Sequence, residues 1–356
     1  MRTRKLFDST RLLLSRPTPK RVVRVQFAVT WRCQLKCSMC NIWQKPKTRE
    51  ITTDEIRRIF DGHEFLDSLR IVDITGGEPF LREDLPEIVE YFANCFSKAD
   101  ILITTNAYST GLTEKLGKRI LDTIPADRIE FSISIDGNER THDAIRGRQG
   151  SFKNALESTQ ILKKLGAKKI TISTTITPQN AEQLPFIYEL AQKIGATFAT
   201  ARFAQNSFYY GNERTTNGNA WTSEKLKVAE VSIQKLLQMR RSREGKSLGL
   251  LRDAYFMKEA VRFQKNPVRT RPCYSGTHSF FIDPEANVYP CVMLPKRIGN
   301  ALESGLDELW FSERADEIRR FIAAGHCACH TECETFSSMQ RNMRDVVKIL
   351  LGVFVS

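Results

Sequence analysis

The sequence predicts an α/β fold, an open (β/α)6 partial TIM barrel followed by a small α+β domain. Six short β-branched segments alternate with longer helical segments between residues 22 and 204. Strands that alternate with helices form a parallel sheet joined by right-handed crossovers. Six repeats fit an open three-quarter barrel better than a closed eightfold one. In either barrel the chemistry belongs at the carboxyl ends of the strands, where the loops gather.

The predicted strands are near-continuous apolar runs, which indicates that both faces of the sheet are covered. They span residues 23–30, 69–75, 100–106, 128–136, 168–176 and 196–204. One helix is expected to open at Thr53, and another runs from Ser151 to a terminating Gly166.

The pattern changes after residue 204. Residues 205–220 are polar and rich in Asn and Gly, which predicts a loop over the barrel mouth, and helices are expected at 223–241 and 249–264. We expect five parts: a basic amphipathic segment (1–22), the barrel (23–204), a loop and basic helical linker (205–270), a cysteine-rich domain (271–340) and an apolar tail (341–356).

The net charge of +13 is concentrated in two segments. Residues 1–24 hold eight basic residues and one acid, and residues 240–271 hold ten basic residues and three acids. Such segments are either solvated helices or patches that face an anionic membrane, nucleic acid or substrate. No recognition motif supports nucleic acid. No segment reaches the roughly 20 apolar residues of a membrane span, so a cytoplasmic protein is expected.

Nine cysteines in a reducing compartment indicate metal or redox chemistry, because eight of them fall in two regions. The ninth, Cys95, is predicted to be a buried core residue. Cys33, Cys37 and Cys40 lie in CQLKCSMC, directly after the first strand. Three thiolates cannot close a structural zinc site, but they can hold a [4Fe-4S] cluster whose fourth iron stays open for a substrate or cofactor.

The motif CQLKCSMC, with GGEP one strand later, resembles the radical S-adenosylmethionine (SAM) superfamily. The resemblance covers Val22 to about Ala204. It implies that Cys33, Cys37 and Cys40 hold a [4Fe-4S] cluster, that SAM binds the open iron, and that reductive cleavage of SAM yields a 5′-deoxyadenosyl radical which abstracts hydrogen from a substrate. It also implies an electron donor such as flavodoxin or ferredoxin. Met39 departs from the family, which commonly has an aromatic residue there.

The resemblance places the cofactor at the ends of the second, third and fourth strands. Glu78 is expected to accept hydrogen bonds from the amino group of SAM, and Gly76 and Gly77 let the backbone approach it. Ser134 and Asp136 match ribose-contacting positions, and Asn106 is expected to reach the same cofactor. Outside this set, Arg146 is a candidate contact for SAM or substrate, and His142 is expected to be structural.

A second cysteine set resembles the SPASM or twitch extension that carries auxiliary clusters. Its members are Cys273, Cys291, Cys327, Cys329 and Cys333. Residues 281–291, FIDPEANVYPC, predict a β-hairpin that brings the first two together. Five cysteines suffice for one auxiliary [4Fe-4S] cluster with one to spare. The alternative is a zinc site that uses His326 or His330.

The expected function is therefore radical SAM chemistry on a peptide, a protein or a small molecule. The basic residues of 1–22 and the apolar run 346–356 favour an alternative, a lipid or membrane-associated substrate with a peripheral contact at the inner membrane surface. A non-catalytic iron-sulfur electron carrier is the alternative from another class, and SAM binding would separate the two.

Overall fold

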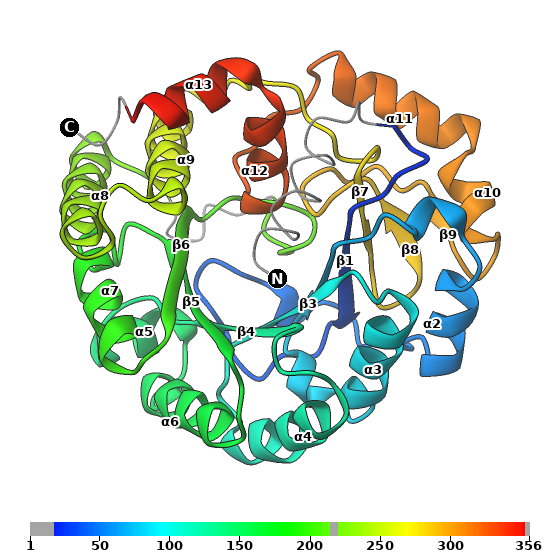
Figure 1. Ribbon diagram of the computed structural model, residues 1–356, viewed down its shortest axis with the longest axis horizontal. Coiled ribbons are helices and arrows are strands. Elements are labelled where there is room, and N and C mark those ends of the chain that lie inside the picture. The colour runs from blue at the N-terminus through cyan, green and yellow to red at the C-terminus, as the bar shows by residue number, and fades with distance from the viewer. Residues whose placement is uncertain (1–17, 214–219, 353–356) are drawn as a thin grey trace.

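The computed structural model describes residues 18–213 and 220–352, with the side chains of residues 199 and 200 left out. It confirms the open, parallel barrel. Its strands are β1 (Arg24–Thr30), β2 (Ile71–Gly76), β3 (Asp100–Thr105), β4 (Ile129–Ser134), β5 (Lys169–Ile176) and β6 (Thr197–Phe203). Each pairs in parallel with the next, and Figure 1 shows them curved around a central space.

Helices cover the outer face of these strands (Figure 1). They are α2 (Thr53–Phe60), α3 (Leu85–Cys95), α4 (Thr110–Thr123), α5 (Glu139–Arg146), α6 (Ser151–Lys164) and α7 (Leu184–Lys193). Local sequence fixes where several begin. Thr52 caps α2 in a reciprocal capping box with Glu55, and the Asn138 side chain accepts from the Thr141 amide at the start of α5.

The near-continuous apolar runs predicted strands that are apolar on both faces. The structure shows instead that only one face of each strand is apolar. In β4, Ile129, Phe131 and Ile133 face the helices and join the main core, whereas Ser132 and Ser134 line the interior. The other strands of the barrel follow the same rule, with polar residues such as Asp73 inside. The interior is a cavity with both polar and apolar side chains in its wall rather than the packed centre of a closed barrel, so inward-facing strand positions can be polar.

The predicted β-hairpin forms, but it extends the barrel sheet instead of standing apart from it. Strands β7 (Ser279–Ile282) and β8 (Asn287–Tyr289) pair antiparallel, and β9 (Gly299–Asn300) continues from β8. Strand β7 pairs in parallel with β1, which gives one sheet in the order β6-β5-β4-β3-β2-β1-β7-β8-β9.

The remaining helices all follow β6 in the sequence. They are α8 (Ser223–Glu244), α9 (Leu248–Lys265), α10 (Leu306–Trp310), α11 (Glu313–Ala323), α12 (Glu332–Arg341) and α13 (Met343–Leu351). Figure 1 shows α9, α12 and α13 across the gap between β6 and β7. The barrel is therefore closed by helices where the strands leave it open.

Much of the basic charge of residues 240–271 is neutralised within the chain. Arg240 pairs with Glu244 and Asp253, and Arg271 pairs with Glu259 and Asp345. These guanidinium groups are thus committed to the fold, which weakens the case for a nucleic-acid surface.

The structure describes only part of the two segments that were predicted to contact a membrane. Most of the N-terminal segment 1–22 lies outside the described residues. Within the tail, α13 buries Asp345 and Ile349 but exposes Met343, Val347 and Leu350. No helix within residues 18–213 and 220–352 is long and apolar enough to span a bilayer.

The prediction for Cys95 is wrong, because this residue ends α3 and is exposed. Its thiol lies 3.4 Å from Asp61 Oδ1.

Asp345 is expected to hold α13 against α9. Tyr255 Oη donates to its Oδ1 at 2.5 Å, and Arg271 Nε donates to its Oδ2 at 2.8 Å. Asp345→Ala should lower the free energy of unfolding by about 3 kcal/mol, because it leaves a buried cation without this partner. The matched control is Asp122→Ala, which breaks an exposed pair with Lys118 and should stay within about 0.5 kcal/mol. Urea denaturation would measure both, and equal effects would contradict this role.

Candidate functional site

Cys33, Cys37 and Cys40 follow β1 and line one end of a cavity inside the barrel. This barrel cavity has a volume of about 330 Å³, and its wall includes the inward-facing side chains of all six strands. It extends to Arg24 and Gln26 at the start of β1. The cysteine loop is therefore the mouth of a chamber that runs the length of the strands.

Backbone hydrogen bonds from two neighbours hold the cysteine loop. The Ser38 amide donates to Ile145 O at 2.8 Å, near the end of α5. The Asn41 amide donates to Tyr210 O at 2.7 Å, in the segment predicted to cross the barrel mouth. Tyr209 and Tyr210 of this segment also line the barrel cavity.

The three thiols are buried, and burial favours their neutral form. They would become thiolate ligands only beside positive charge. The pKa of Cys33 and that of Cys40 are both raised to about 12, mainly by burial, and neighbouring Cys37 contributes to each shift. The pKa of Cys37 is also raised by burial, but the Arg146 guanidinium opposes this, with Nη1 3.8 Å from the sulfur. Three buried thiols beside one arginine fit a cluster that contributes its own positive charge.

The geometry does not favour zinc for either cysteine set. Within residues 18–213 and 220–352, no three Cys, His, Asp or Glu side chains converge on a single ion position. A [4Fe-4S] cluster takes one thiolate at each of several irons, so its ligands need not converge in this way. The donors therefore fit a cluster better than a single metal ion.

The GGEP turn after β2 locks against the loop after β1. The Gly77 amide donates to Thr30 O and the Glu78 amide donates to Arg32 O, both at 2.8 Å. A Cβ atom at Gly76 would lie 2.2 Å from Thr30 O, and one at Gly77 would lie 2.2 Å from Arg32 O. The two glycines thus permit a close backbone approach, directly beside Cys33.

Glu78 is buried behind this turn rather than exposed in the cavity wall. Its Oε1 accepts from Thr105 Oγ1 at 2.6 Å and from the Phe80 amide, and its Oε2 accepts from the Asn106 amide at 2.7 Å. Burial raises the pKa of Glu78 to about 7, although these donors oppose the shift. In this structure Glu78 ties the ends of β2 and β3 together.

Asn106 and Ser134, which the sequence predicts as cofactor contacts, line the barrel cavity. Asn106 Nδ2 lies 3.7 Å from Cys33 Sγ. Asp136 instead lies fully buried, with Oδ2 2.7 Å from Arg146 Nη2 and Oδ1 accepting from the Thr175 amide. It is placed to orient Arg146 rather than to meet a ribose.

Arg146 lines the cavity next to Cys37. It therefore belongs to the site, although the sequence analysis placed it outside the main set of cofactor contacts. The sequence feature that indicates this role is its position in THDAIRGRQG, after the fourth strand. His142 is structural, as expected, since its buried Nδ1 accepts from the Asp136 amide. Burial and then Arg146 lower the pKa of His142 to about 2, which keeps the ring neutral.

The structure also places charged residues inside the barrel that sequence reasoning missed. Arg24 pairs with Asp73 at 2.5 Å, and Arg202 pairs with Glu332 at 2.7 Å, in the wall of the barrel cavity. The sequence feature that could have predicted them is a polar residue at alternate positions of the strands. It was missed because the strands were interpreted as continuous apolar runs.

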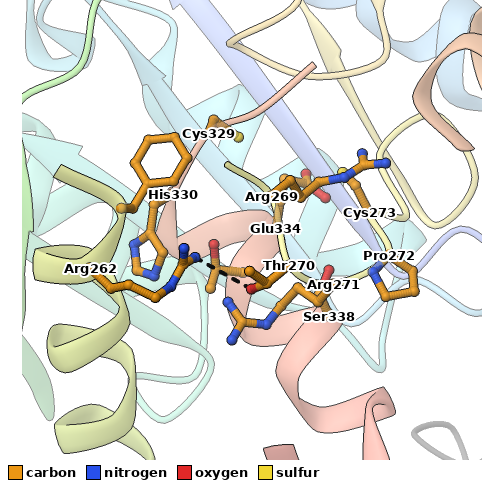
Figure 2. A pocket seen from close by; sticks show the side chains of 12 residues that line it. Arg262, Arg269, Thr270, Arg271, Pro272, Cys273, Cys329, His330, Glu334 and Ser338 are labelled. Atoms are coloured by element: carbon orange, nitrogen blue, oxygen red, sulfur yellow. Dashed lines mark hydrogen bonds between the residues drawn. The ribbon is translucent and has the colours of Figure 1, made fainter. Parts of the chain in front are cut away.

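Four cysteines of the second set lie together. Burial raises the pKa of Cys329, and neighbouring Cys273 and then Cys327 raise it further. The pKa of Cys291 is raised by burial and by Cys329. Figure 2 shows Cys273 and Cys329 in the wall of one small pocket, which we call the auxiliary pocket and which Glu334 also lines.

Cys333 does not line the auxiliary pocket but the barrel cavity. Three thiols thus lie at the barrel mouth, and Cys273 and Cys329 of the second set line the auxiliary pocket.

Comparisons with known families agree with this division. Residues 28–191 match the family model of the radical SAM superfamily, and residues 273–334 match that of SPASM, an iron-sulfur cluster-binding domain.

Similar proteins include an AdoMet-dependent heme synthase of Methanosarcina barkeri, 27% identical over 320 residues that cover 83% of each chain. The mycofactocin maturase MftC of Mycolicibacterium smegmatis is 27% identical over 307 residues, which are 84% of this chain and 73% of MftC. The sporulation killing factor maturation protein SkfB of Bacillus subtilis is 24% identical over 85% of this chain and 67% of SkfB. These relatives are enzymes, which argues against a non-catalytic electron carrier.

Solved structures show the same fold. The protein anSMEcpe with bound AdoMet aligns with a TM-score of 0.62 and 15% identity, over 94% of this chain and 93% of anSMEcpe. Streptococcus suis SuiB bound to S-adenosylmethionine aligns with a TM-score of 0.59 and 16% identity, over 85% of this chain and 68% of SuiB.

Gly77→Ala should displace the cysteine loop, because the new methyl group would overlap the Arg32 carbonyl. We expect a loss of about 1–3 kcal/mol in unfolding free energy and less iron per chain after anaerobic reconstitution. Gly111→Ala in α4 is the matched control, since nothing lies within 4 Å of its new Cβ. Full iron content and wild-type stability in the Gly77 variant would refute the proposed backbone lock.

Proposed function

We propose that the chain is a radical SAM enzyme with a C-terminal SPASM domain and that it abstracts hydrogen from a polar, peptide-like substrate bound inside the barrel. When bound to Cys33, Cys37 and Cys40, the [4Fe-4S] cluster supplies the electron that cleaves SAM into methionine and a 5′-deoxyadenosyl radical. The observation that carries the proposal is the position of these three thiols at the mouth of a cavity inside the barrel, whose wall has both polar and apolar side chains.

The proposed roles of the other residues follow from their contacts. Gly76 and Gly77 bring the backbone to the cysteine loop, and Asn106 and Ser134 present polar side chains to SAM from the cavity wall. Arg146, held by Asp136, stabilises the thiolate of Cys37 and is placed to meet the SAM carboxylate. Glu78 supports these groups through β3 rather than by direct exposure to the cavity.

The auxiliary cluster is proposed to lie between Cys273, Cys291, Cys327 and Cys329. Such a cluster, beside the barrel, would accept the electron that a substrate radical loses or would help to anchor the substrate. An electron donor such as flavodoxin or ferredoxin would reduce the first cluster.

The charges in the barrel favour a substrate that donates hydrogen bonds over one that presents carboxylates. The two other arginines in the cavity wall, Arg24 and Arg202, already carry carboxylate partners. A substrate carboxylate would have to displace one of them. Amide and amine groups would instead meet carboxylate oxygens, which agrees with the peptide-modifying relatives MftC and SkfB.

A second candidate is a step of heme synthesis, favoured by the similarity to AdoMet-dependent heme synthases. Fe-coproporphyrin III is a suitable probe, because a change in its Soret band reports binding. Binding at micromolar concentration would favour this candidate over a peptide-like substrate, and no change in the band would support the proposal.

After strictly anaerobic purification, the wild type and the Cys33→Ala/Cys37→Ala/Cys40→Ala variant should differ in iron content and in SAM cleavage. We expect about eight irons per chain in the wild type and about four in the variant, with cleavage of SAM to 5′-deoxyadenosine abolished. Iron analysis and chromatography of the nucleoside products measure both. SAM cleavage that survives the variant would disprove the assignment of the three cysteines.

A further inference from the structure

The cysteine loop lies within a third basic segment of the chain. From Arg32 to Arg49 the sequence has five basic residues and no Asp or Glu. The two arginines at its ends are paired, Arg32 with Glu50 and Arg49 with Glu55. The three basic residues between them are lysines, at positions 36, 45 and 47. The loop that carries Cys33, Cys37 and Cys40 therefore has an excess of positive charge around it.

Aromatic rings hold two of these lysines. Lys36 Nζ lies 5.2 Å from the centroid of the Trp43 ring, and Lys45 Nζ lies 3.9 Å from the centroid of the Trp31 ring. A ring face attracts an ammonium group without cancelling its charge, as a carboxylate would. Lys36 and Lys47 are exposed, so their positive charge is presented to solvent.

A groove of about 410 Å³ lies on this side of the loop, and we call it the outer groove. Its wall includes Lys45, Lys47 and the paired Arg32 and Glu50. Its wall also includes Cys33 and Trp43, which line the barrel cavity as well. A molecule in the outer groove would therefore reach the side of Cys33 without entering the barrel cavity.

This position suits the delivery of an electron. In the proposed function Cys33 holds the first cluster, while SAM and the substrate occupy the barrel cavity. A one-electron donor must bring its redox centre close to the cluster, because electron transfer weakens steeply with distance. The outer groove offers that approach even when the cavity is occupied.

The charge around the outer groove indicates what kind of donor fits it. A basic surface attracts an acidic partner and speeds their encounter at low ionic strength. Electron-transfer complexes are typically small and weak, so they do not need a large apolar interface. Exposed lysines around a short groove meet this requirement.

We infer that the outer groove is the docking site of a small acidic electron-transfer protein, such as a flavodoxin, and that Lys36 and Lys47 steer it toward Cys33. The inference rests on the proposed function, which assigns the first cluster to Cys33, Cys37 and Cys40. One electron passes from the donor to the cluster, and no bond is made or broken.

Rapid mixing of reduced flavodoxin with the anaerobic holoenzyme tests the docking site, because the visible absorbance of both proteins follows the transfer. At low salt, Lys47→Glu should lower the second-order rate constant by about five- to tenfold. At about 0.5 M salt the difference from wild type should fall below about twofold, because salt screens the charges.

Lys168→Glu is the matched control. Lys168 is exposed and directly precedes β5, so it lies at the opposite end of the strands from the cysteine loop. Its rate constant should stay within about twofold of wild type. An unchanged rate constant in Lys47→Glu at low salt, or an equal fall in Lys168→Glu, would overturn the docking site.

Iron content and the extent of reduction by excess dithionite separate this inference from the proposed function. Both should be the same in wild type and Lys47→Glu, because dithionite is a small molecule that needs no docking surface. A wild type without a reducible cluster would overturn the proposed function and the docking site together. A normal cluster whose reduction by flavodoxin ignores Lys47→Glu would overturn the docking site alone.

Discussion

The site depends on the backbone contact between the ends of β1 and β2. Two glycines allow the turn after β2 to donate its amides to the carbonyls of Thr30 and Arg32, immediately before Cys33. Behind this contact, the Glu78 carboxylate accepts from the ends of β3. Three neighbouring strand ends are thereby tied together, and the cysteine loop starts from a fixed point.

The second constraint is the division of each strand into an apolar outer face and a polar inner face. The outer faces supply the core against the helices, so the interior is free to be polar. A closed barrel would need bulky side chains to fill that interior. Here the sheet stays open, and α9, α12 and α13 cover the gap (Figure 1). One of these helices, α12, brings Cys333 into the cavity.

The sequence was sufficient for the fold class and for the three cysteines at the mouth. Strand positions follow from local β-branched runs, and parallel pairing follows from alternation with helices. It was not sufficient for contacts between distant segments, such as β7 on β1 or α12 against β1. Nor does the sequence show that Cys333, close to Cys329 along the chain, also contacts Gln26 of β1. Cys95 was misplaced for a similar reason: it sits among apolar residues but on the outer side of its helix.

The central claim is that three thiolates leave one iron open to SAM at the barrel mouth. The most direct measurement is the Mössbauer spectrum of the ⁵⁷Fe-reconstituted enzyme before and after SAM is added. The account predicts that SAM shifts the signal of one iron in one of two clusters and leaves the auxiliary cluster unchanged. A spectrum that SAM does not alter, or a cluster whose four irons are all equally ligated, would contradict it.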